Sequence, residues 1–227
     1  MNLLQRLRLA RARRRTALPL QQDLLQHALP SGSARVGGLE LIALDFETTG
    51  LDVQRDHVIA AGWVLIRRGR IVMATARELR VRNSGVGGVG QSAVIHGILD
   101  SDLDDACSVE ALLDSLLPEL AGRAIVAHGA PIERGFLAAL LRRMGGVPLP
   151  NPFIDTLALE RRLVEGAGGR IRELHGDLTL DQCRARRGLP GHQRHSAGAD
   201  AIAAAELLLA QVAELGGVQQ VRLRELR

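Results

Sequence analysis

The apolar positions in the first half of the chain follow strand-like patterns before helical spacing takes over. The run LELIALDFE, residues 39–47, is apolar almost to its end and predicts a buried strand. Residues 57–81 contain two more strand-like runs on either side of Arg68 and Gly69, a pair typical of a tight turn. This part of the pattern therefore predicts three strands, two of which form a hairpin.

From residue 108 onward, apolar residues recur every three or four positions, which is the spacing of amphipathic helices. Helices are predicted over 108–122, 131–146, the later part of 152–163, 178–189 and 196–215. Short apolar segments at 123–129 and at the beginning of 152–163 predict strands between them. Hairpin strands followed by strand–helix alternation indicate an α/β protein with a mixed sheet flanked by helices.

The N-terminal residues 1–38 differ from the rest in composition, and we predict that they form a basic arm and linker. The main domain would then cover residues 39–215, with a short C-terminal tail at 216–227. Three interpretations of the arm stay open. It is a solvated arm or an extra helix packed on the domain, a segment that binds nucleic acid or a partner, or an arginine-rich targeting peptide.

The charge balance adds a weak indication of a polyanionic partner. The net charge is +4, the pI is about 10.6, and every strongly basic residue is arginine. The guanidinium fork of arginine suits phosphate, because it can bind two oxygens at once. Cys107 and Cys183 do not make a disulfide framework, and no apolar run is long enough for a membrane span. These features favour a cytoplasmic protein without a membrane segment.

Two carboxylates stand at the end of the first predicted strand and raise the question of a metal site. Asp45 and Glu47 are two positions apart, so they project from the same side of the strand at its C-terminal end. Open α/β sheets bind their ligands at such ends, and two hard oxygen ligands suit Mg²⁺ or Mn²⁺. A plain strand end with solvated acids is the alternative at this point.

Four segments of the sequence support a metal site, because they resemble the motifs of a known family and occur in the same order. DFETTGL, which begins at Asp45, resembles the first motif of the DEDD superfamily, the DnaQ-like 3′–5′ exonucleases. SAVIHGI (92–98), AHGAPIERGFL (127–137) and RHSAGADA (194–201) resemble the later segments of that family. A histidine five residues before the last aspartate marks the DEDDh branch, which includes the epsilon proofreading subunit of DNA polymerase III and RNase T. The resemblance implies an RNase H-like fold with a mixed five-stranded sheet, here an exonuclease domain.

The resemblance also implies a set of site residues. Two divalent ions, Mg²⁺ or Mn²⁺, would be held by four acidic residues: Asp45, Glu47, Glu133 and Asp200. The general base would be His195. Contacts to the substrate would come from residues near the first motif and before the second: Phe46, Thr48, Thr49, Leu51 and His96.

The second motif departs from the family pattern, in which aspartate and asparagine are usual. Glu133 stands at the aspartate position and Gly129 at the asparagine position. The extra methylene of Glu133 displaces its carboxyl group, so we expect a longer-armed ligand, direct or through water. The alternative is that Glu133 only caps its helix.

Other acidic and imidazole groups have structural interpretations. Asp155 precedes a predicted helix, and it is expected either to cap that helix or to support the acidic site. We expect His128 to be mainly structural. His192 is close to His195 in sequence but matches no family position. A zinc site built from Cys183 and these two histidines would lack a fourth ligand at the usual spacing.

The function predicted from these features is 3′–5′ exonucleolytic hydrolysis that releases 5′ mononucleotides from a single-stranded DNA or RNA 3′ end, with DNA favoured. RNA 3′-end trimming is one alternative. Another is a catalytically weak module of the same fold that binds nucleic acid or a polymerase. A polymerase subunit is a candidate partner, and the sequence does not determine the oligomeric state.

Overall fold

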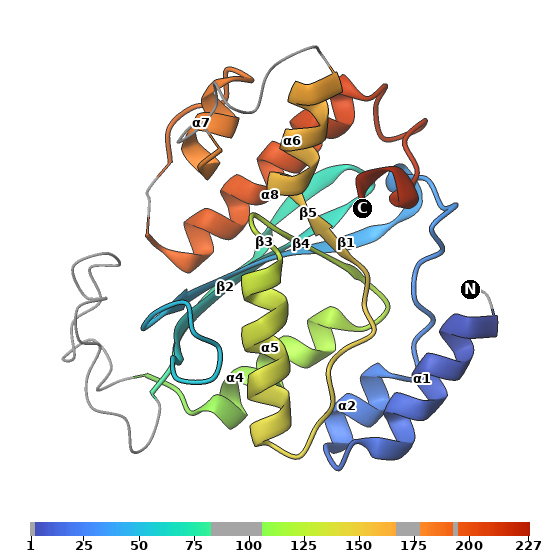
Figure 1. The fold of residues 1–227 in the computed structure, drawn as a ribbon, viewed down its shortest axis with the longest axis vertical. Helices are drawn as coiled ribbons and strands as arrows, with labels where there is room; N and C mark the ends of the chain where they lie inside the picture. Colours follow the sequence, from blue (N-terminus) through green and yellow to red (C-terminus); the bar gives the residue numbers. More distant parts are fainter. Residues whose placement is uncertain (1–2, 83–105, 167–177, 193–194) are drawn as a thin grey trace.

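The computed structural model describes residues 3–82, 106–166, 178–192 and 195–227 (Figure 1). His96 and the predicted motif segment 92–98 lie outside these ranges.

A five-stranded sheet forms the centre of the molecule, with strand order β3-β2-β1-β4-β5. Its strands are β1 (Glu40–Thr48), β2 (Val58–Arg67), β3 (Arg70–Arg80), β4 (Ala124–Ala127) and β5 (Phe153–Asp155). The first three strands are antiparallel neighbours, whereas β4 and β5 run parallel to β1. Arg68 and Gly69 form the β2–β3 turn with positive φ angles of 53° and 70°. The mixed sheet and the hairpin predicted from the sequence are therefore confirmed.

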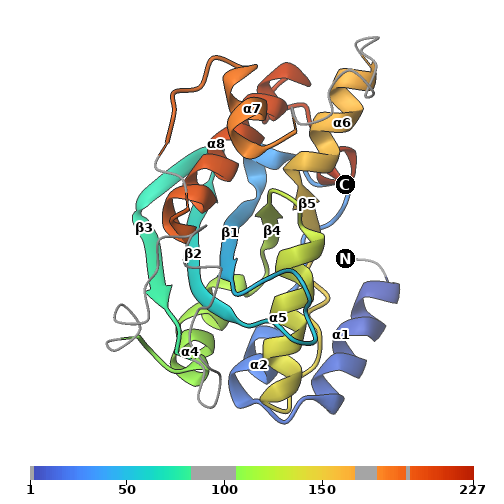
Figure 2. The same cartoon turned by 60° about the vertical axis from the view of Figure 1, so that its left-hand side comes forward.

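Helices cover both faces of this sheet (Figure 2). They are α1 (Leu3–Arg15), α2 (Pro19–Leu24), α4 (Val109–Leu120), α5 (Pro131–Arg143), α6 (Thr156–Gly166), α7 (Leu180–Ala185) and α8 (Ala197–Glu214). Single turns of 3₁₀ helix occur at Val36–Gly38 and Leu223–Leu226. The helices predicted from the 108–215 pattern are all present, and most of their ends lie within a few residues of the predicted ones. No helix in the described ranges is long and apolar enough to cross a membrane.

Alternation along β1 divides the core into two layers. Ile42, Leu44 and Phe46 are buried in the cluster that includes the apolar residues of α4 and α5. Leu41 and Ala43 are buried in the other cluster, which includes the apolar residues of α8. Because successive side chains of a strand face opposite sides, Asp45 and Glu47 continue the series that faces α8. The site therefore lies between the end of the central strand and α8.

The N-terminal segment and the C-terminal tail contribute buried residues to the same two core layers as the domain between them. From the N-terminal segment, Leu9, Leu24 and Leu25 are buried in the α4/α5 cluster. From the other end, Val221 and Leu223 are buried in the α8 cluster. Burial of these apolar residues favours packing on the domain, which for the N-terminal segment is one of the interpretations that the sequence left open.

Candidate active site

Three carboxylate side chains gather at the end of β1. Asp45 and Glu47 come from the strand, and Asp200 comes from the first turn of α8. One oxygen of each lies within 4.8 Å of the others, and in the described part of the chain no further group of three or more potential ligands is as close. The expected approach of Asp200 to the Asp45–Glu47 pair is confirmed.

The N-terminus of α8 can lie close to the end of β1 because the β2 residue that it covers is a glycine, Gly62. Gly62 pairs with Asp45 across the β1–β2 ladder. A Cβ atom on Gly62 would lie 2.0 Å from the carbonyl carbon of Ala197, far inside contact distance. The absence of that atom lets the helix rest on the sheet and brings Asp200 over the strand end.

A carboxylate on the next strand fastens the same helix end. Glu78 pairs with Gly62 in the β2–β3 ladder. Its Oε2 accepts hydrogen bonds from Ser196 Oγ at 2.6 Å and from the backbone N–H of Gly198 at 2.8 Å. Unpaired N–H groups and the helix dipole make this helix end attractive to an anion. Asp45, Gly62 and Glu78 therefore form one row across three strands, with the α8 N-terminus lying on it.

The electrostatics of the acidic group at the end of β1 favour a bound cation. Burial raises the pKa of Asp45 well above its ordinary value, and the neighbouring charges of Glu133, Glu47 and Asp200 raise it further. Burial also raises the pKa of Asp200, although a hydrogen bond with His192 acts in the opposite direction. Such crowding of carboxylates is unfavourable unless a positive charge compensates it. The oxygen donors fit Mg²⁺ or Mn²⁺ in chemistry and spacing.

Glu133 lies outside the group of three whose oxygens meet within 4.8 Å, so the cage of four acids stays a prediction. It lies in the first turn of α5, is 4% exposed, and its Oε2 has no hydrogen-bond partner among the described residues. Burial raises its pKa to about 8, and the charge of Asp155 contributes to that rise. Its charge nevertheless acts on Asp45, so the side chain borders the site. A buried carboxylate oxygen without a partner is a suitable ligand for an added cation.

The raised pKa of Glu133 predicts a pH dependence of stability for the metal-free protein. Between its ordinary pKa of 4.5 and the folded value of about 8, the unfolded chain releases this proton while the folded chain keeps it. The free energy of unfolding should therefore fall as pH rises through this window, by on the order of 5 kcal/mol. Denaturant unfolding in the presence of a chelator measures this slope.

The variant Glu133→Gln should flatten the slope without removing it, because Asp45 titrates in the same direction. The exposed Glu165 supplies a matched control, since Glu165→Gln should leave the slope unchanged. An equal slope in the wild-type protein and the Glu133→Gln variant would contradict the burial of an unpaired carboxylate at this position.

The two histidines before α8 have different positions. His195 is exposed, has a φ angle of 62°, and donates its backbone N–H to Asp200 Oδ2 at 3.2 Å. The Nε2 of His192 lies 2.6 Å from Asp200 Oδ1, and its Nδ1 lies 3.1 Å from Asp181 Oδ1. His192 thus bridges α7 to the acidic group. Sequence reasoning passed over it because motif spacing alone favoured His195; its position depends on how the 186–192 segment folds back.

A small cavity lined mainly by polar residues lies beside these groups. Its volume is about 170 Å³, and it is lined by Asp45, His128, Thr179, Leu180, Asp181, His192, His195 and Asp200. Cys183 is fully buried, and burial raises the pKa of its thiol to about 11, so it is poorly suited to ligating a metal. The structure therefore gives no support to a zinc site with Cys183.

The predicted substrate residues differ in what they offer. Leu51 is 75% exposed and free to contact a ligand. Thr48 Oγ1 donates to the Gly50 carbonyl at 2.7 Å, and Thr49 Oγ1 donates to Asp56 Oδ1 at 3.1 Å, so both hydroxyls shape the loop that carries Leu51. The side chain of Phe46 is 6% exposed in the opposite core layer, so it does not face the site.

His128 and Asp155 have the structural roles expected of them. The Nδ1 of His128 lies 3.0 Å from Thr156 Oγ1, and its Nε2 lies 3.0 Å from the Leu178 carbonyl, a distance at which the ring nitrogen donates. Asp155 Oδ1 accepts from the backbone N–H groups of Leu157 and Gly129, each at 3.0 Å. Asp155 therefore caps α6 and ties it to the turn before α5.

The central strand of a mixed five-stranded sheet ends in acidic residues that meet a further aspartate on a flanking helix. This combination defines the class, an RNase H-like nuclease with a carboxylate site. The chain belongs to the exonuclease family, because the family's RNase T sequence profile matches residues 42–208. The resemblance seen in the motifs is thereby confirmed.

The curated relatives that the chain matches include PolC-type DNA polymerase III proteins. The chain is 30% identical over 202 residues to DNA polymerase III PolC-type of Thermotoga maritima, covering 86% of this chain and 14% of that protein. A PolC-type polymerase of Staphylococcus epidermidis is 27% identical over 175 residues, which are 77% of this chain and 11% of the relative. The chain therefore spans only a small part of the proteins it matches.

Solved structures with the same fold include several exonucleases. The nuclease domain of 3′hExo, a DEDDh family member bound to rAMP, aligns with a TM-score of 0.64 at 16% identity, covering 86% of this chain and 98% of that domain. Exonuclease X in complex with 5′ overhanging duplex DNA aligns with a TM-score of 0.59 at 22% identity. The alignment covers 82% of this chain and 99% of Exonuclease X. Both likenesses concern the fold.

Proposed function

We propose that this chain is a metal-dependent 3′–5′ exonuclease that removes 5′ mononucleotides from single-stranded nucleic-acid 3′ ends, with DNA favoured. The observation that carries the proposal is the convergence of Asp45, Glu47 and Asp200 from distant parts of the sequence. Polymerase III relatives and an exonuclease neighbour solved with a dT13 oligonucleotide support DNA. The neighbour with bound rAMP keeps RNA 3′-end trimming as the alternative.

In this proposal, one set of residues holds the cations and another residue moves a proton. Asp45, Glu47 and Asp200 would hold Mg²⁺ or Mn²⁺, two ions per site, with Glu133 contributing from the edge. Such ions, when bound, activate water and stabilise the charge of the leaving oxygen. The imidazole of His195, which is exposed beside Asp200, takes the proton of the attacking water.

The substrate side of the site lies at the loop after β1. Leu51 projects from this loop and would pack on the terminal base, while Thr48 and Thr49 hold the loop in shape. Loop 49–57 is braced by a hydrogen bond from the backbone N–H of His57 to Thr49 Oγ1 at 3.0 Å. A braced loop positions the 3′ end reproducibly, which is a large part of the catalysis of hydrolysis.

An assay with labelled oligonucleotides tests the polarity and the substrate. We expect a strand labelled at its 5′ end to give a ladder that shortens one nucleotide at a time in Mn²⁺, and no products in a chelator. Matched DNA and RNA strands separate proofreading-type activity from RNA trimming. A chain that binds the strands in Mn²⁺ without shortening them would favour the non-catalytic alternative, a module that binds nucleic acid or a polymerase.

Two histidine variants should have separable effects. His195→Ala should lower kcat by about 10²–10⁴-fold while leaving Mn²⁺ affinity near the wild-type value, because His195 would move a proton. His192→Gln should weaken Mn²⁺ binding about 10–100-fold, because its ring holds Asp200 at 2.6 Å. Calorimetric Mn²⁺ titrations alongside single-turnover kinetics distinguish them. If His192→Gln lowered kcat without weakening Mn²⁺ binding, and His195→Ala did not lower kcat, the general base would be His192 instead.

A further inference from the structure

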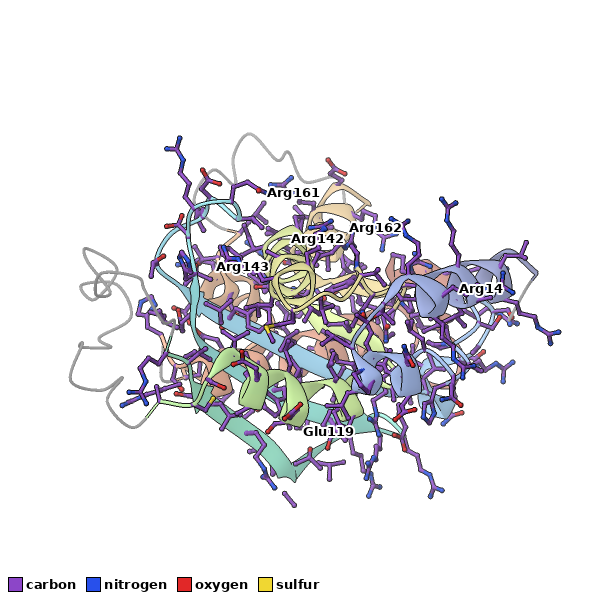
Figure 3. The ribbon with its side chains drawn as sticks, turned by 90° about the horizontal axis from the view of Figure 1, so that it is seen from below. Arg14, Glu119, Arg142, Arg143, Arg161 and Arg162 are labelled. Atoms are coloured by element: carbon purple, nitrogen blue, oxygen red, sulfur yellow. The ribbon has the colours of Figure 1, made fainter. Side chains whose placement is uncertain are left out.

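A surface rich in unneutralised arginine lies away from the acidic site. Arg11, Arg14 and Arg15 of α1 and Arg142 and Arg143 at the end of α5 are all exposed. Figure 3 shows Arg14 on α1 and the Arg142–Arg143 pair at the end of α5, seen from below. None of the five forms an ion pair with a described residue.

Other arginines in the described part of the chain do form ion pairs with carboxylates. Arg123 is paired with Glu40 at 2.7 Å, and Arg184 is paired with Glu206 at 2.6 Å. The sequence explains part of the difference, because residues 1–22 contain no acidic residue. The positive charge of this surface is therefore uncompensated from within its own segment.

The helix α1 is held against the domain, so its arginines have defined positions. Leu9 is 6% exposed in the core cluster. After the helix, the backbone N–H of Ala17 donates to the Gly145 carbonyl at 3.0 Å, and Gln21 Oε1 accepts from the backbone N–H of Val147 at 2.9 Å. These bonds join the N-terminal segment to the chain that leaves α5.

A groove runs between α1 and that chain. Its volume is about 230 Å³, and it is lined by Arg11, Ala12, Arg15, Val147, Pro148 and Pro150. Arg11 and Arg15 are four residues apart and therefore share one face of the helix. The lining is mostly apolar, and Arg11 and Arg15 are its only charged residues. With two guanidinium groups at the groove and no carboxylate, a phosphate is favoured over a cation there.

The α5 helix connects this surface to the catalytic end of the molecule. Its first turn carries Glu133, and its last turn carries Arg142 and Arg143. Thirteen residues of helix span roughly 20 Å. Loop 49–57 packs on the middle of the helix, where a Cβ atom on Gly135 would lie 2.9 Å from Val53 Cγ2. Burial lowers the pKa of His57 in that loop, and the nearby charge of Arg143 lowers it further.

We propose that the surface formed by Arg11, Arg14, Arg15, Arg142 and Arg143 binds the phosphate backbone of nucleic acid several nucleotides away from the scissile bond. The inference rests on the proposed exonuclease function and names a second contact for the same substrate. Helix dipoles favour arginine in the last turns of α1 and α5, but Arg11 lies a turn earlier and the groove stands between two segments. A nucleic-acid strand carries a phosphate at every nucleotide, so a distributed set of cations can contact several of them at once.

The test compares two double charge reversals in the full chain. Arg11→Glu/Arg15→Glu changes the groove, and Arg70→Glu/Arg224→Glu changes two exposed arginines outside this surface by the same net charge. Fluorescence anisotropy in Ca²⁺ measures affinity for a DNA strand of about 30 nucleotides across a salt series. Hydrolysis of a DNA strand of about four nucleotides in Mn²⁺ reports the catalytic site separately.

We expect the groove variant to bind the long strand roughly 10–30-fold more weakly near 0.1 M salt, with a salt slope lower by about 1.4. Hydrolysis of the short strand should be unchanged, and the control variant should bind like the wild-type chain. Equal long-strand affinity for the groove variant and the wild type would overturn this inference and favour an acidic protein partner. A wild-type chain that does not hydrolyse the short strand in Mn²⁺ would instead refute the proposed function.

Discussion

Replacement of Asp45 by asparagine is expected to abolish hydrolysis while making the metal-free protein more stable. Asp45 lies among the carboxylates of Glu47, Glu133 and Asp200, whose charges, together with burial, raise its pKa well above the ordinary value. An amide of the same shape relieves this repulsion but cannot ligate a cation as a carboxylate does. Activity should fall about a thousandfold or more.

Thermal unfolding supplies the second measurement. In a chelator at pH 8, the Asp45→Asn variant should melt about 3 °C or more above the wild-type protein. Added Mn²⁺ should stabilise the wild-type protein and leave the variant almost unaffected, because ligand binding to the folded state raises Tm. Asp114→Asn, at an exposed position of α4, is the matched control and should behave like the wild type in both measurements. A variant that melts at a lower temperature in the chelator would contradict the crowding of negative charge.

Replacement of Gly62 by alanine is expected to damage both stability and activity, although Gly62 carries no chemical group. The added Cβ would lie 2.0 Å from the carbonyl carbon of Ala197 and 2.2 Å from the backbone nitrogen of Gly198. These atoms belong to the backbone of α8, which must move away from the sheet to make room. Asp200 would move with it, away from Asp45 and Glu47.

Overpacking of this kind costs about 2–3 kcal/mol, which lowers Tm by roughly 5–10 °C. The displacement of Asp200 should reduce activity by about 100-fold or more at saturating Mn²⁺. Gly38→Ala is the control, because no atom lies within 4 Å of a Cβ at that glycine. Denaturant unfolding and the oligonucleotide assay measure the two effects. Wild-type activity in a stably folded Gly62→Ala protein would show that close approach of α8 is not required.

The sheet and the layers around it could be predicted because they depend on local periodicity. Residues 57–81 needed only alternation and the Arg68–Gly69 turn to indicate the hairpin, and the structure contains it. The strand that carries Asp45 also placed Glu47 on the same side, since the pleat alone determines that relation. These local patterns describe each strand or helix by itself, without its contacts to distant segments.

Relations between distant segments were harder to obtain from the sequence. The burial of Leu9 and Leu223 depends on partners far along the chain, so composition alone suggested an arm and a tail. Glu133 matched a motif position, but its distance from the other acids depends on how α5 packs against the sheet. His192 matched no motif, and only the fold of the preceding loop brings it to Asp200. The motif resemblance likewise implied that Phe46 contacts the substrate, whereas the pleat turns its side chain into the opposite core layer.

Anomalous diffraction from a crystal soaked in Mn²⁺ and a nucleoside monophosphate tests the cation site most directly. The account predicts manganese peaks within about 2.3 Å of oxygens from Asp45, Glu47 and Asp200, with the nucleotide phosphate on the same ions. Fully soaked crystals with nucleotide bound but no manganese peak at these three carboxylates would contradict it.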